Sequence, residues 1–174
     1  MSLYHHFPSK GHLLDAVCDR LMTMVTIPPR EAGDWEMRLR ESILSYRAVA
    51  RAHPRAFLLM ATRRFNTPGA LWVLDRLLEI FADAGFDPQM RARAFRILGY
   101  YLNGALLSEV TILAQVPDPT GSRIDAGEIG EELPYLYASG RYLGPEWLDA
   151  TYEAGIEILF DAIRDRAGDG SSTP

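Results

Sequence analysis

Apolar residues recur three or four positions apart over most of the chain, which is the spacing of one face of an α-helix. No segment shows the strict alternation of apolar and polar residues that marks a half-buried strand. The sequence therefore predicts an all-α protein. Prolines, glycines and capping residues divide it into helices that we expect at about 10–24, 35–52, 55–61, 68–85, 88–115, 128–138 and 145–166.

The fifth of these helices contains the longest apolar stretch, from Ile97 to Val116, close to the ~20 residues that span a bilayer. Asn103 and Glu109 interrupt it, and an unpaired carboxylate at bilayer depth is costly. We therefore expect the central helix of a bundle and no membrane partner. Glu109 must then be paired within the chain, lie at a subunit interface, or face a polar cavity.

The last expected helix has two distinct faces. Its apolar residues, Tyr152 and Ile156 among them, follow a helical period and predict a buried face. A second row of the same helix is entirely acidic and consists of Asp149, Glu153, Glu157 and Asp161.

The composition is that of an ordinary globular protein, with 48% hydrophobic and 24% charged residues. Eighteen basic against 23 acidic residues give a net charge of −5, which argues against a protein that coats nucleic acid or an anionic membrane. The single cysteine, Cys18, excludes an internal disulfide and a cysteine-based zinc site. It fits a reducing compartment, so we expect a cytoplasmic protein.

The sequence offers little catalytic chemistry. No serine lies in a glycine-flanked elbow, and no glycine loop of the phosphate-binding type is present. His12, Asp15 and Asp19 share a helical face, but such a trio arises easily by chance. We expect no enzyme activity, no cofactor and no metal.

The first residues, from Ser2 to Lys10 (SLYHHFPSK), resemble a signature of the tetracycline-repressor (TetR) family of transcriptional regulators. The resemblance implies a remnant of the DNA-binding helix-turn-helix at 1–27, a ligand-binding and dimerisation domain at 28–168, and a flexible tail at 169–174. Further landmarks of the family follow in order: Asp34-Trp35, Arg47 with His53-Pro54, Ala84-Gly85-Phe86, Gly104 with Glu109, and the run at 155–160.

The resemblance also implies contacts with operator DNA, in the intact full-length form only. Family members place two helices before the recognition helix, and this chain begins inside it. We therefore expect that these 174 residues alone do not bind DNA sequence-specifically. The implied DNA-contacting residues are Ser2, Tyr4, His5, His6 and Lys10.

A further implication is a small-molecule cavity among the middle helices. The positions that match the drug-contacting histidines of tetracycline repressors are Thr26 and Met60, which cannot replace imidazole. We therefore expect a hydrophobic or aromatic effector rather than tetracycline. The predicted pocket residues are Phe57, Met60, Trp72, Leu98, Tyr101, Leu102, Asn103, Glu109 and Tyr135.

The last implication is a homodimer formed by the helices at 88–115 and 145–166. The first of these is apolar over most of its circumference, more than one core can cover, and its small residues permit close helix approach. The predicted interface consists of Gly104, Ala105, Ile112, Tyr152, Ile156, Leu159, Phe160 and Ile163. The leading hypothesis is a ligand-responsive repressor, and the alternative is a helical dimerisation or adaptor module without a small-molecule ligand.

Overall fold

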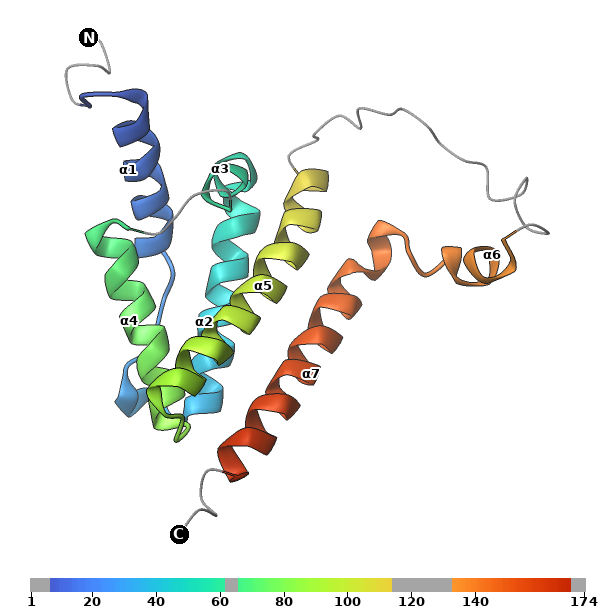
Figure 1. Ribbon diagram of the computed structural model, residues 1–174. Helices are drawn as coiled ribbons and strands as arrows, with labels where there is room; N and C mark the ends of the chain where they lie inside the picture. Colours follow the sequence, from blue (N-terminus) through green and yellow to red (C-terminus); the bar gives the residue numbers. More distant parts are fainter. Residues whose placement is uncertain (1–6, 62–65, 114–132, 170–174) are drawn as a thin grey trace.

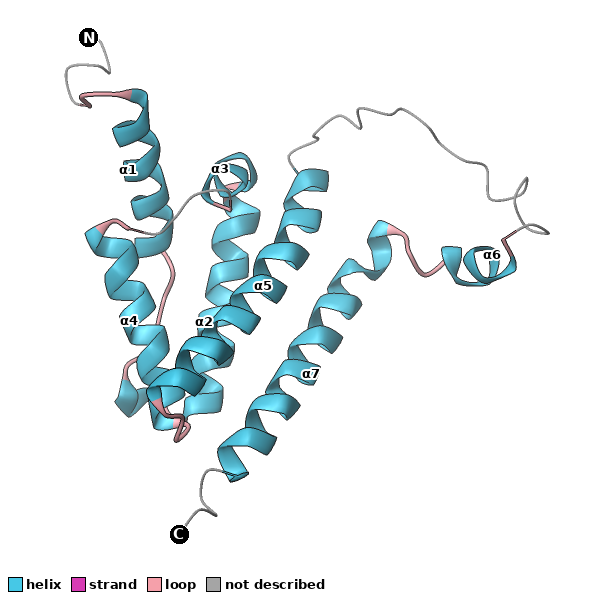
Figure 2. Cartoon of the chain, in the orientation of Figure 1, coloured by secondary structure: helices cyan, strands magenta, loops and turns pink. Residues whose placement is uncertain are grey.

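The computed structural model describes residues 7–61, 66–113 and 133–169 (Figure 1). Over these residues the chain is helical and contains no strand (Figure 2), which confirms the predicted fold class. The helices are α1 (Lys10–Thr23), α2 (Trp35–Ala52), α3 (Pro54–Met60), α4 (Pro68–Asp83), α5 (Pro88–Leu113), α6 (Pro134–Gly140) and α7 (Leu148–Asp169), with 3₁₀ turns at Arg30–Ala32 and Pro145–Trp147.

Capping residues account for most of the helix boundaries. Ser9, Asp34 and Asp87 each accept a hydrogen bond from the backbone N–H three residues later, at 3.3, 2.8 and 2.8 Å. Such caps replace a hydrogen bond that the first turn of a helix lacks. Gly85 ends α4 at φ 88°, a conformation that only glycine adopts readily. These signals are local, which is why the sequence predicted them.

The predicted boundaries were less accurate near the C-terminus. α6 begins at Pro134 rather than 128, although residues 128–132 lie outside the described part of the chain. The last helix starts as a 3₁₀ turn at Pro145–Trp147 and becomes α-helical at Leu148. It then runs to Asp169, three residues beyond its expected end. The predicted end of the fifth helix, at about 115, also lies outside the described residues.

The helices surround one hydrophobic core. In Figure 1, α1 and α4 lie on one side, α2 is central, and α5 and α7 run antiparallel along the other side. Cys18, Leu21 and Met22 of α1 are buried in the same core as side chains of α2 to α5 and α7. The helix that was assigned to the DNA-binding remnant thus packs as part of the regulatory bundle. α6 projects as an arm without buried residues.

The long helix α5 belongs to this bundle. Leu98, Leu102, Leu106 and Val110 are at most 7% exposed and pack into the core. None of the helices that the structure describes combines the length and the apolar character that a membrane span requires.

A buried arginine fixes the lower end of the bundle. The side chain of Arg38 on α2 is 1% exposed. Its guanidinium donates to the carbonyl oxygen of Pro28 at 3.1 Å and to the carboxylate of Asp83 at 2.5 Å. The link between α1 and α2 and the C-terminal end of α4 are therefore both held to α2. Arg30 also pairs with Asp83, so that carboxylate has two cationic partners.

We predict that Arg38→Met lowers the free energy of unfolding by about 3 kcal/mol, because it removes buried charge-assisted hydrogen bonds and leaves the Pro28 carbonyl without its donor. The matched control is Arg55→Met, at an exposed arginine of α3. This change is expected to shift stability by no more than about 0.5 kcal/mol. Urea denaturation followed by circular dichroism measures both, and equal effects would contradict the role assigned to Arg38.

Candidate functional site

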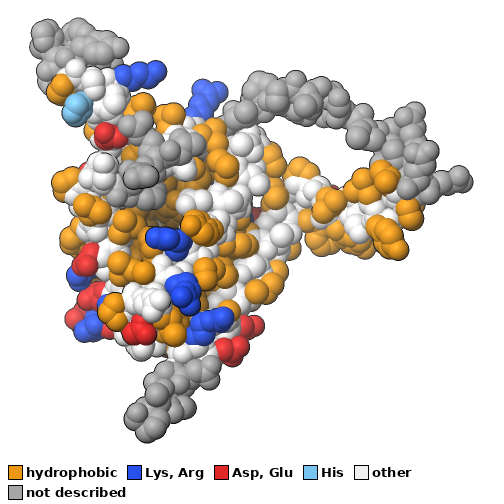
Figure 3. Space-filling model, in the orientation of Figure 1, with side chains coloured by type: hydrophobic (Ala, Val, Ile, Leu, Met, Phe, Trp, Pro, Cys, Tyr) orange, Lys and Arg blue, Asp and Glu red, His pale blue; other side chains and the backbone are white. Residues whose placement is uncertain are grey.

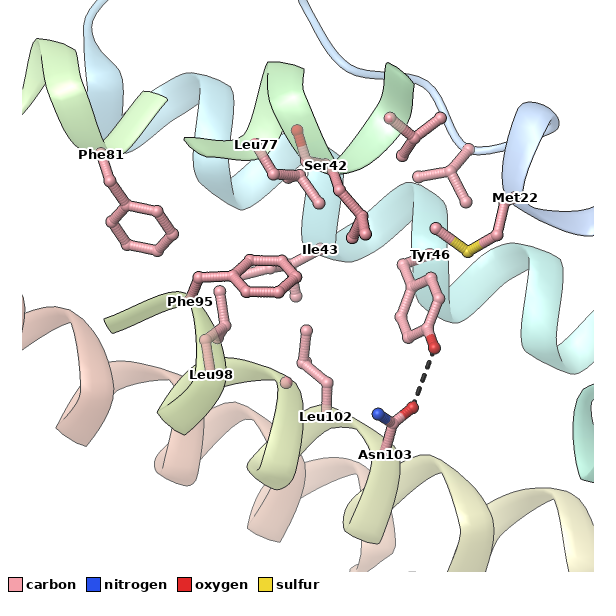
Figure 4. Close-up of a pocket in the computed structure, with 14 residues that line it drawn as sticks. Met22, Ser42, Ile43, Tyr46, Leu77, Phe81, Phe95, Leu98, Leu102 and Asn103 are labelled. Atoms are coloured by element: carbon pink, nitrogen blue, oxygen red, sulfur yellow. Dashed lines mark hydrogen bonds between the residues drawn. The ribbon is translucent and has the colours of Figure 1, made fainter. Parts of the chain in front are cut away.

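A cavity of about 80 Å³ lies between α1, α2, α4 and α5. On α5 its lining residues recur at helical spacing, so a single face of that helix forms one wall. Figure 4 shows side chains of all four helices converging on this space. The lining residues are Met22, Val25, Ser42, Ile43, Tyr46, Val73, Leu74, Leu77, Phe81, Phe95, Leu98, Gly99, Leu102 and Asn103.

The cavity is mostly apolar: besides Ser42, its polar side chains are a pair at one end. There the hydroxyl of Tyr46 donates to Oδ1 of Asn103 at 2.9 Å (Figure 4). Burial raises the pKa of Tyr46, so the phenol keeps its proton and acts as the donor. The Tyr46 ring also packs edge-on against Phe57, with the centroids 5.7 Å apart. None of the lining residues carries a charge.

The size of the cavity limits what it can hold without movement. Pockets for drug-sized ligands usually measure about 300–1,000 Å³. A volume of about 80 Å³ is well below that range. An aromatic ligand therefore requires a wall of the cavity to move outward. The part of the lining that belongs to α4 and to the end of α1 is apolar: Val73 and Leu77 come from α4, Met22 from α1, and Val25 from the residues just after α1.

α1 and α4 are joined by an unusual cap. Thr67, at the N-cap position of α4, makes no capping hydrogen bond of its own. Instead, the carboxylate of Asp19 on α1 accepts from the Thr67 hydroxyl and, at 3.1 Å, from the backbone N–H of Ala70. A Cβ at Gly69 would lie 2.7 Å from an Asp19 oxygen and 2.7 Å from the Thr23 methyl group. Glycine is thus what allows the first turn of α4 to approach α1 so closely.

On the opposite side, arginines of α2 face the acidic row of α7. Arg47 pairs with Glu109 at 3.1 Å and with Glu153 at 3.2 Å. Arg51 binds both Glu109 and Asp149. Arg47 and Glu109 are buried, so each charge depends on the other. Of the alternatives for Glu109, pairing within the chain is the one that the structure adopts.

A second group of ion pairs lies lower on the same interface. Arg40 pairs with Glu157 at 2.5 Å and with Glu36 at 3.0 Å. Arg164 of α7 reaches Glu36 at 2.6 Å. Three residues of the acidic row, Asp149, Glu153 and Glu157, are therefore paired with arginines of α2. The fourth, Asp161, pairs with Arg164 of the same helix. Periodicity could not reveal the partners on α2, because they come from another helix.

The structure brings only part of the predicted pocket together. Leu98, Leu102 and Asn103 line the cavity, whereas Phe57 and Met60 are buried beside it in the core. The remaining four residues lie elsewhere. Trp72 is 61% and Tyr135 88% exposed, the Tyr101 hydroxyl donates to the backbone oxygen of Tyr152 at 2.8 Å, and Glu109 belongs to the ion pairs described above.

The sequence prediction placed the cavity among the middle helices, but it left out α1 and named none of the residues of α2 and α4 that line it. On α4, Val73, Leu77 and Phe81 lie four residues apart on one helical face. Core residues show the same helical spacing, so the pattern carries no signal that separates cavity-lining residues from solid packing. Of the two positions matched to drug-contacting histidines, Thr26 is exposed and Met60 is buried.

The predicted interface residues divide into two groups. Tyr152, Ile156, Phe160 and Ile163 are 1–7% exposed and pack inside this chain, with Leu159 and Ala105 partly buried beside them. Gly104 and Ile112 face outward. The apolar side of α7 packs inward against α2 and α5 of the same chain, beside the acidic row. Among the residues of α7 whose side chains are described, the large apolar side chain that is exposed is Ile158, at 68%.

Of the predicted DNA-contacting residues, Lys10 is the one that lies within the described part of the chain. Ser2, Tyr4, His5 and His6 lie outside the described residues. Lys10 is exposed in the first turn of α1. Over the part of the chain that is described, no group of three or more His, Cys, Asp or Glu side chains could hold a metal ion. Asp19, from the trio weighed as a metal site, instead caps α4.

Comparisons with known proteins match nearly the whole chain. Residues 27–166 match the family model described as "Tetracyclin repressor-like, C-terminal domain". The class A tetracycline repressor protein from transposon 1721 of Escherichia coli is 29% identical, over 95% of this chain and 75% of its own length. The HTH-type transcriptional repressor DrrR1 of Streptomyces coeruleorubidus is 30% identical, over 82% of this chain and 53% of its own.

Solved structures are similar in fold. A possible TetR family transcriptional regulator from Streptomyces coelicolor A3(2) has a TM-score of 0.76 and 25% identity, and the match covers 94% of this chain and 82% of that one. The S. coelicolor TetR family protein ActR in complex with actinorhodin has a TM-score of 0.73 and 23% identity, over 95% and 81% of the two chains. The second likeness shows a shared fold only.

The ion pairs between α2 and α7 predict an acid-sensitive contribution to stability. Hydrogen bonds from Arg164 lower the pKa of Glu36 from 4.5 to about 2. Because the folded pKa lies below the unfolded value, this stabilisation is complete above pH 4.5 and is lost as the pH falls from 4.5 toward 2. Glu36→Gln should remove up to about 1 kcal/mol at neutral pH and flatten the acid limb of the stability curve.

Urea denaturation at several pH values between 2 and 7 tests this prediction, with Glu41→Gln as the matched control, since Glu41 is an exposed residue of the same helix. The control should keep the wild-type acid limb. An unchanged acid limb in Glu36→Gln would be incompatible with the assigned pairing.

Proposed function

This chain belongs to the TetR family of ligand-responsive transcriptional regulators, and we propose that its effector is a mostly apolar small molecule that binds in the cavity between α1, α2, α4 and α5. The observation that carries the proposal is the composition of that cavity, which is mostly apolar, has no charged lining residue and has a polar pair, Tyr46 and Asn103, at one end. Ligand sites of this kind use a few polar groups to orient an otherwise hydrophobic molecule.

We further propose that α1 transmits the binding event. A ligand larger than the cavity displaces the wall that α1 and α4 share. The Asp19 cap makes the upper part of α4 and α1 move together, whereas the Arg38–Asp83 pair holds the lower end of α4 to α2. The motion is therefore a swing about that lower end. Coupling requires that ligand and DNA favour different positions of α1.

We assign the regions from the family resemblance. Residues 28–168 are the effector-binding and dimerisation domain, and Met22 and Val25 of the preceding segment also line its cavity. Residues 1–27 are the remnant of the DNA-binding domain, and Ser2, Tyr4, His5, His6 and Lys10 are our candidates for operator contacts in a full-length regulator. Asp169, the first residue of the predicted tail, is instead the last residue of α7, and the rest of that tail lies outside the described residues.

We also propose a homodimer built from the outward faces of α5 and α7. Ile97, Tyr100, Leu107 and Ile112 form an apolar row on α5 that is 39–70% exposed. Within the same row, a Cβ at Gly104 would meet nothing within 4 Å. Glycine inside a helix destabilises it by about 1 kcal/mol relative to alanine. Close packing of a second helix against α5 at Gly104 would explain why a glycine occupies this position. This outward face replaces the buried residues first assigned to the interface.

The alternative function is a dimerisation or adaptor module without a small-molecule ligand. The small volume of the cavity favours it, because a solid core would leave a similar void. The two functions differ in one measurable property. A sensor is stabilised by a compound that fits the cavity, and an adaptor is not.

The experiment that tests the proposed function fills the cavity from within. Gly99 lines it, and a Cβ there meets nothing within 4 Å. We predict that benzene, toluene or indole at millimolar concentration raises the melting temperature of the wild type by several degrees. Gly99→Leu should raise the melting temperature of the free protein and abolish the response to all three compounds.

The matched control is Gly140→Leu, at a glycine of α6 that is equally open and distant from the cavity. It should keep the full response to the three compounds. Loss of the response in the control, or its persistence in Gly99→Leu, would place binding elsewhere. Absence of any response in the wild type would favour the adaptor.

Ile158→Glu should dissociate the proposed dimer without unfolding the chain, since it introduces a charge on an outward face of α7. The matched control is Leu44→Glu on α2, where the leucine is 54% exposed. Light scattering coupled to size exclusion should give a monomer for the first variant and a dimer for the control. A monomeric wild type would exclude this interface.

A further inference from the structure

The polar end of the cavity contains a donor group that has no acceptor among the residues that the structure describes. Oδ1 of Asn103 accepts from the Tyr46 hydroxyl at 2.9 Å, so the other amide atom, Nδ2, is turned away from Tyr46. In Figure 4 that nitrogen points toward the side of the cavity where Leu102 lies. Among the described residues nothing accepts a hydrogen bond from it.

The other polar groups of the cavity are already engaged as donors. The Tyr46 hydroxyl donates to Asn103, and the Ser42 hydroxyl donates to the backbone oxygen of Arg38 at 2.7 Å. Asn103 is only partly buried, so Nδ2 can bond to water in the free protein. A ligand that displaces this water without supplying an acceptor leaves the donor unpaired, which costs about 1–3 kcal/mol. The Asn103 amide is therefore the group in this cavity that gains most from a ligand with a hydrogen-bond acceptor.

The walls exclude charged ligands. None of the lining residues could neutralise an anion or a cation, and an unpaired charge in apolar surroundings is strongly disfavoured. The body of the ligand must instead match the aromatic and branched side chains of Leu77, Phe81 and Phe95, which face it from α4 and α5.

We infer that the effector is a neutral, ring-containing carbonyl compound whose oxygen accepts a hydrogen bond from the Asn103 amide. This inference rests on the proposed function, because it assumes that the cavity is the effector site. Asn103 is then the specificity-determining residue. Tyr46 is a positioning residue, since its hydroxyl holds the amide oxygen and so presents the amide nitrogen to the ligand.

Three small probes separate the hydrogen bond from simple hydrophobic binding. Acetophenone carries the carbonyl group, α-methylstyrene has the same shape with a methylene group in place of the oxygen, and benzoate carries a charge. Dissociation constants are measured by ligand-observed NMR titration for the wild type, Asn103→Leu and Tyr46→Phe. The matched control is Asn66→Leu, the same substitution at an exposed asparagine that does not line the cavity.

The expected result is a change confined to the ketone. Asn103→Leu should weaken acetophenone about five-fold, the size of one neutral hydrogen bond, and leave α-methylstyrene unchanged or bound more tightly. Tyr46→Phe should reduce the affinity for acetophenone about two-fold, because the freed amide can turn either atom toward the ligand. It should leave α-methylstyrene unchanged. Asn66→Leu should change neither, and benzoate should show no saturable binding.

The results that would contradict the carbonyl inference differ from those that would contradict the proposed function. If Asn103→Leu alters both neutral probes by the same factor, or benzoate binds more tightly than acetophenone, the carbonyl inference is wrong while the cavity stays a ligand site. If neither neutral probe binds the wild type, the proposed function fails and the inference fails with it. Tyr46→Phe removes a single oxygen atom, so it provides the same comparison if Asn103→Leu does not fold.

Discussion

The carboxylate of Asp19 is the contact on which the functional arrangement of this fold depends. It belongs to α1, yet it caps the first turn of α4, where it accepts from the backbone N–H of Ala70 and from the hydroxyl of Thr67. Thr67 lies 48 residues further along the chain than Asp19, so this cap is not a local one. A cap contributes typically about 1 kcal/mol, and a charged acceptor strengthens it. Gly69 makes the approach possible, because a side chain there would displace Asp19. Through this contact α1 and the upper part of α4 form one unit.

The rest of the bundle is held by different forces. Ion pairs centred on Arg47 and Glu109 hold α2, α5 and α7 together, and removing one member would leave a buried charge uncompensated. The wall of the cavity on the α1 and α4 side is formed by apolar contacts, which have no comparable directional constraint. The proposed sensor requires that the unit of α1 and the upper part of α4 shifts against the frame formed by α2, α5 and α7.

Much of the fold could be predicted because its signals are local. Ser9, Asp34 and Asp87 mark helix starts by their own side chains, and Gly85 ends a helix by its backbone conformation. The family resemblance carried by the first residues and by the landmarks after them is confirmed by the match over residues 27–166.

The site was less predictable because its contacts join distant helices. Asn103 was recognised as an unusual polar residue in an apolar helix, but its partner Tyr46 lies 57 positions earlier and has no pattern that identifies it. Trp72 was assigned to the pocket for its aromatic character, and the rotation of α4 instead exposes it. Helical spacing also could not tell whether the apolar face of α7 packs within the chain or against a second copy. In the structure this face is buried within the chain, next to acidic residues that pair with arginines of α2.

Double electron–electron resonance between spin labels tests the central claim, that α1 and α4 move together against the frame when the cavity is filled. The first distance, between labels at Lys10→Cys and Trp72→Cys, joins α1 to α4. The second distance, between labels at Lys10→Cys and Asp165→Cys, joins α1 to α7. All three sites are exposed. In a Cys18→Ala background, diluted with unlabelled protein, saturating toluene should shift the second distance and leave the first unchanged. A shift of the first distance, or no shift of the second while toluene is bound, would contradict the account.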